Sequence, residues 1–441
     1  MESNKNTTKH ILERLQISAL NDMQQAMTSA AQKNGNMVLL SPTGSGKTIA
    51  FLLALLQELK EDPALGVQAL VLAPSRELAL QITQVFKDMQ TGFKVNCCYG
   101  GHSIKTELNS LQVPPTLLIG TPGRIADHLR RESFTTEGIQ HLILDEFDKS
   151  LELGFAKEMS FIIEELPNLK RRHLTSATSA VEVPEFVGLV QPTTLNFLSE
   201  KKSDALSTKA LVTNSANRES DFLKLINYVG SEPTLVFCNQ RATVERVSNM
   251  LFKSGIEHDI FHGGLEQKDR ELALIKFKNG SHNILVTTDL AARGLDIPTI
   301  QHIIHYQLPH TESEFIHRNG RTARMEATGT AYLILEQDKP WREYIDETIE
   351  YIELPETVPP LQKPTWKTLY ISAGKKDKVN KFDIVGTLFK KGGLQKEDLG
   401  LVVVKEYVSY AAVHQDKVNQ VIKNISKKRI KKKQVLVELA R

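Results

Sequence analysis

The sequence predicts an α/β protein with two tandem parallel-sheet lobes followed by a small α+β domain. Two long segments repeat one pattern, in which short β-branched apolar runs end in Gly, Thr, Ser or Asp loops and precede amphipathic stretches of helical length. The C-terminal segment follows a proline-rich stretch and has a different order of elements. With 441 residues, the chain is long enough for roughly two to four domains.

The apolar runs place the strands of the two lobes. In the first lobe, strands are predicted at Met37–Leu40, Ala69–Ala73, Leu117–Gly120, His141–Leu144 and His173–Thr175. In the second lobe, strands are predicted at Thr234–Cys238, Asp259–His262, Asn283–Thr287 and His302–His305. Most polar motifs begin where one of these strands ends, which is where ligand sites lie in open α/β sheets.

Two segments divide the chain, one polar (Glu200–Asp204) and one rich in proline (Pro355–Pro364). We expect the first lobe at 1–200, a linker at 201–207, the second lobe at 208–354, an extended linker at 355–364 and the C-terminal domain at 365–441. The last domain has the order β, α, β, β, α, β, which suits an RRM-like sheet backed by two helices. Its strands are predicted at Lys367–Ser372, Leu401–Lys405, Tyr407–Val413 and Val435–Leu439, with helices near Phe382–Lys391 and Asp416–Lys428.

Composition favours an ordinary globular protein, since 41% of the residues are hydrophobic and 24% are charged. The longest apolar stretches, such as Phe51–Leu56, fall short of the ~20 residues that span a bilayer, and the N-terminus lacks the apolar core of a signal peptide. We therefore expect a cytoplasmic protein without a membrane partner. The three cysteines (Cys97, Cys98 and Cys238) have no CxxC spacing, so neither structural zinc nor disulfides are expected.

The charge is distributed unevenly along the chain. Residues 365–441 carry 18 Lys and Arg against 7 Asp and Glu, a balance of +11, whereas residues 1–364 have a balance of −8. Such a basic block can be a solvated face. In a short folded domain, however, this balance favours a polyanionic partner.

The first strand is followed by the string SPTGSGKT, Ser41 to Thr48, which opens an apolar helix at Ile49–Leu59. In this strand–loop–helix setting, glycines let backbone amides turn toward phosphate oxygens, and the helix N-terminus adds its dipole. Lys47 is expected to reach the β- and γ-phosphates, and Thr48 to offer a hydroxyl to Mg²⁺. The loop therefore predicts a nucleoside triphosphate site, formed by Thr43, Gly44, Ser45, Gly46, Lys47 and Thr48.

The string DEFD, Asp145 to Asp148, follows the strand HLIL. Asp145 at the strand tip can orient Mg²⁺, directly or through water, and Glu146 can polarise the water that attacks the phosphoryl group. Acidic residues at strand ends are common, so the assignment depends on the pairing with Lys47.

The second lobe ends its series of motifs with HRNGRTAR, His317 to Arg324. Arg321 and Arg324 are spaced to lie on one face of a helix, where they can neutralise charge on the transferring phosphoryl group. The alternative is a surface helix with ordinary salt bridges.

These motifs in this order resemble the DEAD-box RNA helicases of superfamily 2, from about Asp22 to Thr330. The resemblance implies two RecA-like lobes, ATP and Mg²⁺ as cofactors, and an RNA-stimulated ATP hydrolase that unwinds or remodels short RNA duplexes. PSREL, Gly100–Gly101, TPGR, HGGLEQKDRE and TTDLAARGLDIP look like the family's RNA-backbone motifs. They imply RNA contacts from Arg76, Gly101, Thr121, Arg124, Gly264, Thr288 and Arg293.

The same resemblance implies further roles in the site. The SAT string, Ser176 to Thr178, is similar to the motif that links hydrolysis to strand separation, and we expect it to bond Asp148. Gln24 matches the glutamine that binds the adenine edge, and Asp296 would contact the ribose. The chain departs from the family pattern at Phe147, where alanine is usual, at Leu20–Asn21, and near Thr7, where an aromatic residue is usual. Phe147 should pack beneath the loop.

Residues 365–441 resemble the RNA-binding domain of DbpA-type helicases, most clearly in GKKDKVNKFDIVGTL, Gly374 to Leu388. Helicases with this domain are directed to a hairpin of large-subunit ribosomal RNA, which implies a role in ribosome assembly. Lys375, Lys376 and Lys378 are the expected contacts. The strand residues Tyr370, Tyr407 and Tyr410 can stack on bases or simply pack, and we expect the protein to be a monomer.

Two alternatives use the same scaffold. One is a DNA translocase, because fold alone does not choose a substrate. The other is an idle RNA-binding scaffold that uses ATP only as a clamp. The presence of Lys47, Glu146, Arg321 and Arg324 argues against the second.

Overall fold

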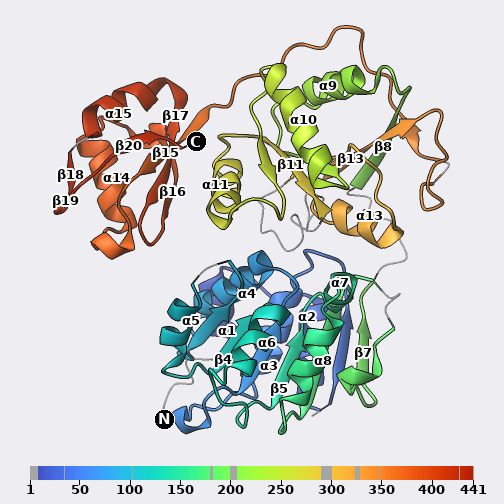
Figure 1. Cartoon of the computed structure of the whole chain (residues 1–441), viewed down its shortest axis with the longest axis vertical. Coiled ribbons are helices and arrows are strands. Elements are labelled where there is room, and N and C mark those ends of the chain that lie inside the picture. The colour runs from blue at the N-terminus through green and yellow to red at the C-terminus, as the bar shows by residue number, and fades with distance from the viewer. Residues whose placement is uncertain are drawn as a thin grey trace. The chain divides into compact units, whose positions relative to one another are not determined.

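The computed structural model describes residues 8–33, 35–101, 103–178, 182–198, 206–289, 300–322, 328–346, 348–426 and 428–440. The chain divides into two compact units, with the main boundary after Ser203. The second unit contains both the second lobe and the C-terminal domain. Figure 1 shows the elements of each.

The first lobe has a seven-stranded parallel sheet in the order β3-β4-β2-β5-β6-β1-β7. The strands are β1 (Met37–Leu40), β2 (Ala69–Leu72), β3 (Val95–Cys98), β4 (Leu117–Gly120), β5 (His141–Leu144), β6 (Arg171–Ser176) and β7 (Thr193–Asn196). The helices are α1 (Thr8–Leu15), α2 (Asp22–Ala31), α3 (Lys47–Leu56), α4 (Arg76–Asp88), α5 (Ile104–Leu111), α6 (Pro122–Arg130), α7 (Phe147–Glu152) and α8 (Ala156–Glu164).

The central strands of this sheet are buried on both faces. In β2, Ala69 and Val71 belong to one apolar core, whereas Leu70 and Leu72 belong to another. Successive side chains of a strand point to opposite faces, so helices must cover both sides. This explains why the strands read as continuous apolar runs.

The second lobe repeats this sheet with the order β10-β11-β9-β12-β13-β8-β14, again parallel throughout. Its strands are β8 (Leu206–Thr213), β9 (Thr234–Cys238), β10 (Asp259–Phe261), β11 (Ile284–Thr288), β12 (His302–His305), β13 (Gly329–Glu336) and β14 (Glu350–Tyr351). Its helices are α9 (Arg218–Val229), α10 (Arg241–Lys253), α11 (Gln267–Lys278) and α13 (Glu312–Asn319). After β14, the proline-rich segment stays attached to this lobe, because the Leu361 amide donates to Asn227 Oδ1 at 3.0 Å.

The C-terminal domain has a four-stranded antiparallel sheet in the order β16-β17-β15-β20. The strands are β15 (Trp366–Ile371), β16 (Leu399–Val404), β17 (Ser409–His414) and β20 (Val437–Leu439), and a separate hairpin joins β18 (Arg429–Ile430) to β19 (Lys433–Gln434). Helices α14 (Lys381–Lys390) and α15 (Val418–Ile425) lie together on one side of the sheet (Figure 1). Their apolar faces form one core with the sheet.

The structure confirms the predicted fold class and adds strands that the sequence did not indicate. In the lobes these are β3, β7, β8, β13 and β14, and in the C-terminal domain they are β18 and β19. β3 and β7 lie at the two edges of their sheet, where part of each strand faces solvent, so their sequences lack a continuous apolar run. β8 begins at Leu206, inside the range 201–207 that was expected to be a linker.

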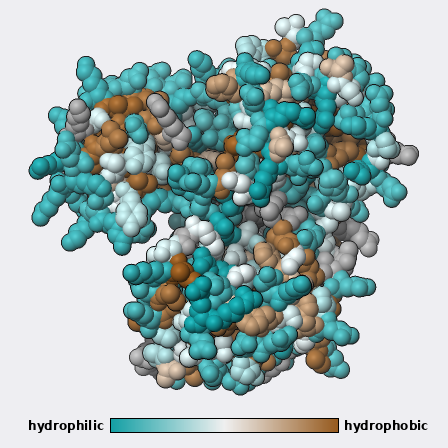
Figure 2. Space-filling view, viewed as in Figure 1, coloured by the Kyte–Doolittle hydropathy of each residue, from teal (hydrophilic) through white to brown (hydrophobic). Residues whose placement is uncertain are grey.

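Short 3-10 turns complete the described structure, at Pro63–Leu65, Glu185–Val187, Lys375–Asp377, Lys396–Asp398 and Gln415–Lys417. In the view of Figure 2, the surface is mainly hydrophilic and its apolar residues are exposed in separate groups. Within the described ranges, none of the helices combines the length and the apolar character that crossing a membrane requires.

Candidate functional site

The predicted phosphate loop connects β1 to α3. Gly44 and Gly46 have φ angles of 83° and 91°, in the left-handed region that favours glycine. Gly46 is the N-cap of α3, and the next residue, Lys47, is only 8% exposed. The ammonium group of Lys47 donates to the carbonyl oxygens of Ser41 and Pro42, at 2.6 and 3.0 Å. The loop thus brings backbone amides and a held cation to the same place, which suits a polyphosphate.

Helix α2 supports this loop from the side. Gln24 is buried, and its Nε2 donates to the carbonyl oxygen of Gly46 at 3.3 Å. A Cβ on Gly46 would lie 2.5 Å from the same nitrogen, so a larger residue would displace Gln24. Asn21 caps α2 in a reciprocal capping box with Gln24 and also donates to the carbonyl oxygen of Ser45 at 3.0 Å. In the sequence, Asn21 stands out only as a departure from the family pattern, although the spacing N-x-x-Q is itself a capping signal.

The DEFD string begins at the end of β5, where Asp145 and Glu146 are both buried. The Thr175 hydroxyl, from the neighbouring strand β6, donates to Asp145 and accepts from the Glu146 amide at 3.1 Å. Burial raises the pKa of the Asp145 carboxyl to about 6, and the nearby charge of Glu146 acts in the same direction. Thr175 therefore fixes the carboxylate of Asp145 and the backbone of Glu146, a role that the sequence did not indicate.

Glu146 has two unusual features. Its φ of 47° lies in the left-handed region, which is strained for a residue with a Cβ. Among the described residues, its buried Oε2 has no hydrogen-bond partner. An unpaired buried oxygen beside a second buried carboxylate is costly unless a cation or a water molecule binds there.

The expected contact between the SAT string and Asp148 is present. Thr178 Oγ1 donates to Asp148 Oδ2 at 3.3 Å, and Ser176 Oγ accepts from the Thr178 amide at 3.0 Å. Phe147 is 2% exposed and belongs to an apolar core of the first lobe, as expected for its position beneath the loop. The bulky residue is thus accommodated by packing.

Arg76 and Gly101 lie against each other. A Cβ on Gly101 would lie 2.3 Å from Arg76 Nη1, and Gly101 has a φ of 98°. Only glycine leaves room for the guanidinium group at this position. The second lobe repeats the arrangement, since a Cβ on Gly263 would lie 3.2 Å from Arg241 Nη2.

Glu107 organises the residues around the TPGR string. Thr121 is the N-cap of α6, and Arg124 Nε donates to the Tyr99 carbonyl oxygen at 3.2 Å. Arg124 also lies 3.4 Å from Glu107, which accepts from the Tyr99 amide and is linked to His128 at 2.7 Å. Glu107 is 2% exposed, so these contacts hold Arg124 firmly. No pattern in the sequence indicated this role.

The same carboxylate also belongs to a group of potential metal ligands. Cys98, Glu107 and His128 offer ligand atoms within 4.8 Å of one another. Glu107 already pairs with Arg124 and His128, and burial raises the pKa of the Cys98 thiol far above its ordinary value. The group therefore fits an ion-pair network better than a metal site.

In the second lobe, a buried arginine links several motifs. Arg318 lies on α13 and binds Asp289 through two hydrogen bonds of 2.5 and 2.6 Å. It also donates to Asn239 Oδ1 at 2.8 Å and to the Gln307 carbonyl oxygen at 2.6 Å. The predicted RNA residue Thr288 is buried at the end of β11, directly before Asp289. Arg318 therefore fixes Asp289, directly after the end of β11.

The predicted residues Gly264 and Arg321 are both described. The Gly264 amide donates to His262 Nδ1 at 3.1 Å, and His262 Nε2 is linked to Glu245 at 2.8 Å. The prediction that a helix carries Arg321 is wrong, because α13 ends at Asn319 with Gly320 as its C-cap. Arg321 lies in the following turn and is buried. The expected site residues Arg293, Asp296 and Arg324 lie outside the described residues.

Comparisons with known proteins agree with this geometry. The chain matches the DEAD/DEAH box helicase family over residues 21–186, the helicase conserved C-terminal domain over 218–326 and the DbpA RNA binding domain over 368–439. The ATP-dependent RNA helicase DbpA of Escherichia coli is 30% identical over 98% of this chain and 99% of its own length.

Two further matches each cover about three quarters of this chain. The ATP-dependent rRNA helicase rrp-3 of Neurospora crassa is 35% identical over 74% of this chain and 64% of its own length. The structure of S. cerevisiae Dbp5 bound to RNA and ADP BeF3 matches 74% of this chain and 86% of its own, with a TM-score of 0.66 and 27% identity. The chain belongs to the DEAD-box family of ATP-dependent RNA helicases, of the DbpA type that carries a C-terminal RNA-binding domain.

Proposed function

We propose that this helicase uses ATP hydrolysis in its lobes to remodel large-subunit ribosomal RNA that its C-terminal domain selects. The observation that carries this proposal is the combination of a formed phosphate loop with a separately folded basic domain. The loop holds Lys47 through the carbonyl oxygens of Ser41 and Pro42, whereas the +11 balance of residues 365–441 lies outside the lobes. Catalysis and RNA choice are therefore assigned to different parts of the chain.

ATP binding is assigned to the phosphate loop and its supports. Thr43 to Thr48 cradle the phosphates, Lys47 neutralises their charge, Gln24 binds the adenine edge and Asp296 the ribose. Thr48 and Asp145 would hold Mg²⁺, partly through water. The buried carboxylates fit a divalent cation, because Glu146 Oε2 has no hydrogen-bond partner among the described residues and the neighbouring Asp145 is a second buried carboxylate.

The chemistry then depends on residues that act on the phosphoryl group. When bound, Mg²⁺ neutralises charge on the phosphates. Glu146 polarises the attacking water, and its left-handed backbone fixes the direction of its carboxylate. Arg321 and Arg324 stabilise the charge on the transferring group. The contact between Thr178 and Asp148 transmits the change at this site to the SAT string.

The lobes hold RNA through its backbone. We assign this role to Arg76, Gly101, Thr121, Arg124, Gly264, Thr288 and Arg293, which offer small residues, hydroxyl groups and guanidinium groups rather than base-reading surfaces. The lobes should therefore be indifferent to RNA sequence. We propose that the protein acts as a monomer, with selectivity supplied by the domain that contains Lys375, Lys376 and Lys378.

The ribosomal target rests on two supports. The C-terminal domain matches the DbpA RNA binding domain, and the Neurospora crassa relative is named an rRNA helicase. The test compares RNA-stimulated ATPase activity of the full chain and of residues 1–364, using ribosomal RNA and an unrelated RNA of equal length. The full chain should prefer ribosomal RNA, and residues 1–364 should retain weak activity without that preference. Equal preference in both proteins would refute the assignment.

A further inference from the structure

Two strongly exposed aromatic rings follow the end of the C-terminal sheet at which β15 ends and β17 begins. Phe382, the second residue of α14, is 86% exposed, more than any other large hydrophobic residue in the described ranges. Tyr407, in the turn between β16 and β17, is 68% exposed. A single exposed apolar residue needs no explanation, but two rings in a basic domain suggest a ligand with flat apolar faces.

The segment from Gly374 to Lys381 connects the turn that carries Tyr407 to the start of α14, which carries Phe382. The amides of Lys375 and Lys376 donate to the carbonyl oxygens of Lys405 and Glu406, at 2.9 and 2.8 Å. A Cβ on Gly374 would lie 2.5 Å from the Lys405 carbonyl oxygen, so this packing requires a glycine. The segment thus starts beside the turn that carries Tyr407 and continues directly to Phe382 on α14.

The segment between the rings is positively charged. Lys375, Lys376, Lys378 and Lys381 are exposed, and within the described ranges no salt bridge involves them. The two acidic residues of this stretch are already neutralised, because Lys433 pairs with Asp377 at 2.8 Å and Lys431 with Asp383 at 2.7 Å. Both cations come from the β18–β19 hairpin and its turn. Four lysines therefore remain available for phosphate groups between two rings.

The open face of the sheet offers other aromatic residues, in an acidic setting. Tyr370 and Tyr410 lie opposite each other on β15 and β17, with ring centroids 6.0 Å apart. Glu438 lies opposite Tyr370 on β20. Burial raises the pKa of Tyr410, and the nearby carboxylates of Glu271 and Asp269 act in the same direction. Lys405 pairs with Glu271, but Asp269 and Glu438 still place negative charge beside the sheet tyrosines, which disfavours an RNA backbone.

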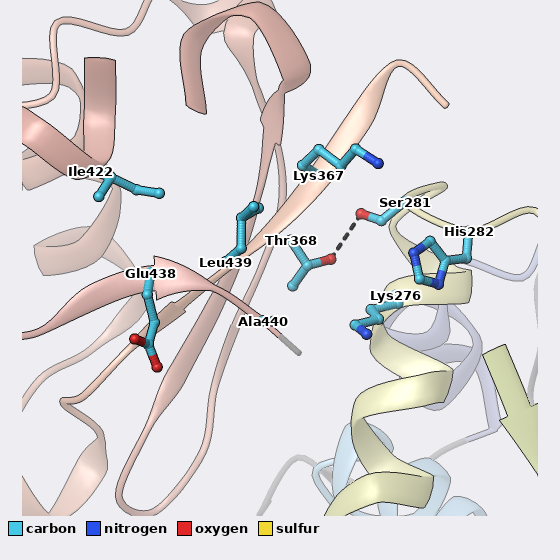
Figure 3. A pocket seen from close by; sticks show the side chains of 9 residues that line it. All are labelled: Lys276, Ser281, His282, Lys367, Thr368, Ile422, Glu438, Leu439 and Ala440. Atoms are coloured by element: carbon cyan, nitrogen blue, oxygen red, sulfur yellow. Dashed lines mark hydrogen bonds between the residues drawn. The ribbon is translucent and has the colours of Figure 1, made fainter. Parts of the chain in front are cut away.

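The same face also contacts the second lobe. Thr368, two residues before Tyr370 and so on the same face, is buried and bonds Ser281 at 2.8 Å and Asn279 at 3.3 Å. Figure 3 shows Thr368 pointing toward Ser281, just beyond the end of α11. Lys405 adds a salt bridge of 2.9 Å to Glu271 of α11. RNA bases could reach this part of the sheet only if these contacts broke.

The pocket beside Thr368 is not an anion site either. Three of its side chains can carry a positive charge, namely Lys276, His282 and Lys367 (Figure 3). Lys276 and His282 both lie against Asp259, at 3.5 and 2.7 Å, and Lys367 binds Glu257 at 2.5 Å. Each cation thus has a carboxylate partner, unlike the lysines near Phe382.

We propose that the C-terminal domain binds unpaired RNA bases on the rings of Phe382 and Tyr407, with Lys375, Lys376, Lys378 and Lys381 binding the phosphates between them. The open face of the sheet instead holds the domain to the second lobe. This inference rests on the proposed role of the domain in RNA selection and names the surface that performs it. Its ligand is a single-stranded loop or extension, because bases in a duplex do not expose their faces.

The test measures the affinity of the full chain, without nucleotide, for a fluorescein-labelled RNA hairpin that has an unpaired loop. Phe382→Leu and Tyr407→Leu should each weaken binding by about 5- to 150-fold, the range expected for loss of one base–aromatic stack. Tyr407→Phe should retain binding, because it keeps the ring. Phe252→Leu is the matched control, since Phe252 is a 77% exposed ring in the second lobe and should leave affinity unchanged.

Two further measurements distinguish base stacking from electrostatic attraction as contributions to RNA binding. A 2-aminopurine base in the loop should be quenched on binding to the wild-type protein and less quenched with Phe382→Leu. Replacing Lys375, Lys376 and Lys378 by Gln should reduce the salt dependence of binding, by roughly one unit of log–log slope for each phosphate group that the variant no longer neutralises.

The outcomes distinguish this inference from the proposed function. If Tyr370→Leu weakens hairpin binding while Phe382→Leu and Tyr407→Leu do not, the sheet is the binding surface and the inference is wrong. If the lysine variant loses binding but both ring variants keep it, the stacking assignment alone is overturned. If the wild-type chain binds the hairpin no better than residues 1–364 do, RNA selection by the domain fails as well.

Discussion

The hydroxyl group of Thr175 donates a hydrogen bond to the buried carboxylate of Asp145. Through this contact, strand β6 positions an acidic group of the proposed nucleotide site. The hydrogen bond favours the charged carboxylate, but burial and the charge of Glu146 outweigh it, so the pKa of Asp145 stays raised at about 6.

This pKa predicts a pH dependence of stability. Because the folded-state pKa lies above the ordinary value of 3.8, the folded protein binds more protons than the unfolded chain between about pH 4 and pH 6. The free energy of unfolding should therefore fall by on the order of 2 kcal/mol as pH rises through this window, for this group alone. The Asp145→Asn variant should not show this contribution to the pH dependence of the free energy of unfolding.

The measurement is denaturant unfolding of both proteins from pH 4 to pH 7, with EDTA present. Buried His141 and His173, whose pKa values are lowered to about 4, destabilise the fold as pH falls and act in the opposite direction. The difference between wild type and Asp145→Asn is therefore the relevant quantity. A difference that does not change with pH would contradict the prediction.

Substitutions of Lys47 and Glu146 should impair different steps, ATP binding for Lys47 and ATP hydrolysis for Glu146. Lys47→Ala should weaken ATP binding, because the phosphates lose their cation. Glu146→Gln should still bind ATP and RNA but hydrolyse ATP about 10²- to 10⁴-fold more slowly, the range for loss of a general base. Single-turnover hydrolysis and nucleotide titration separate the two effects. Glu61→Gln, at an exposed position, is the control, and wild-type turnover by Glu146→Gln would show that another group activates the water.

Gly101→Ala should impair RNA binding through Arg76. The new Cβ would lie 2.3 Å from the guanidinium group at a φ of 98°, so Arg76 must move. Loss of one charged hydrogen bond to phosphate should weaken RNA affinity by about 10-fold or more, with ATP affinity unchanged. Gly92→Ala is the matched control, because Gly92 has a similar φ of 87°, lies outside the motifs assigned to RNA, and has nothing within 4 Å of its Cβ position. Equal RNA affinity of the two variants would exclude this role of Arg76.

The pair formed by Arg318 and Asp289 should be important for the stability of the second lobe. The Arg318 side chain is only 1% exposed, so Asp289→Asn leaves a buried cation without its main partner. The free energy of unfolding should fall by about 3–5 kcal/mol. Lys209→Ala, which removes an exposed pair with Glu350, should cost less than about 1 kcal/mol. Chemical denaturation of both variants tests the contrast, and similar losses would contradict it.

The sequence alone determined the features that depend on local chain chemistry. A phosphate loop requires glycines between a strand and a helix. The string SPTGSGKT therefore predicted the loop without information on residues distant in the sequence. The order of motifs identified the family, which the comparisons confirm, and the fold class followed from the repeated apolar runs. The ribosomal target and the roles of the individual site residues remain predictions.

Tertiary structure decided the features in which partners come from distant parts of the chain. Thr175 reaches Asp145 because β5 and β6 are neighbours in the sheet, and Glu107 reaches Arg124 because α5 and α6 lie near each other at the ends of β3 and β4. In the sequence, Tyr370 and Tyr410 are candidates for stacking on bases. The carboxylates that disfavour RNA beside them come from β20 and α11, which are distant in the sequence. No local pattern encodes such neighbours, since they depend on strand order and packing rather than on spacing along the chain.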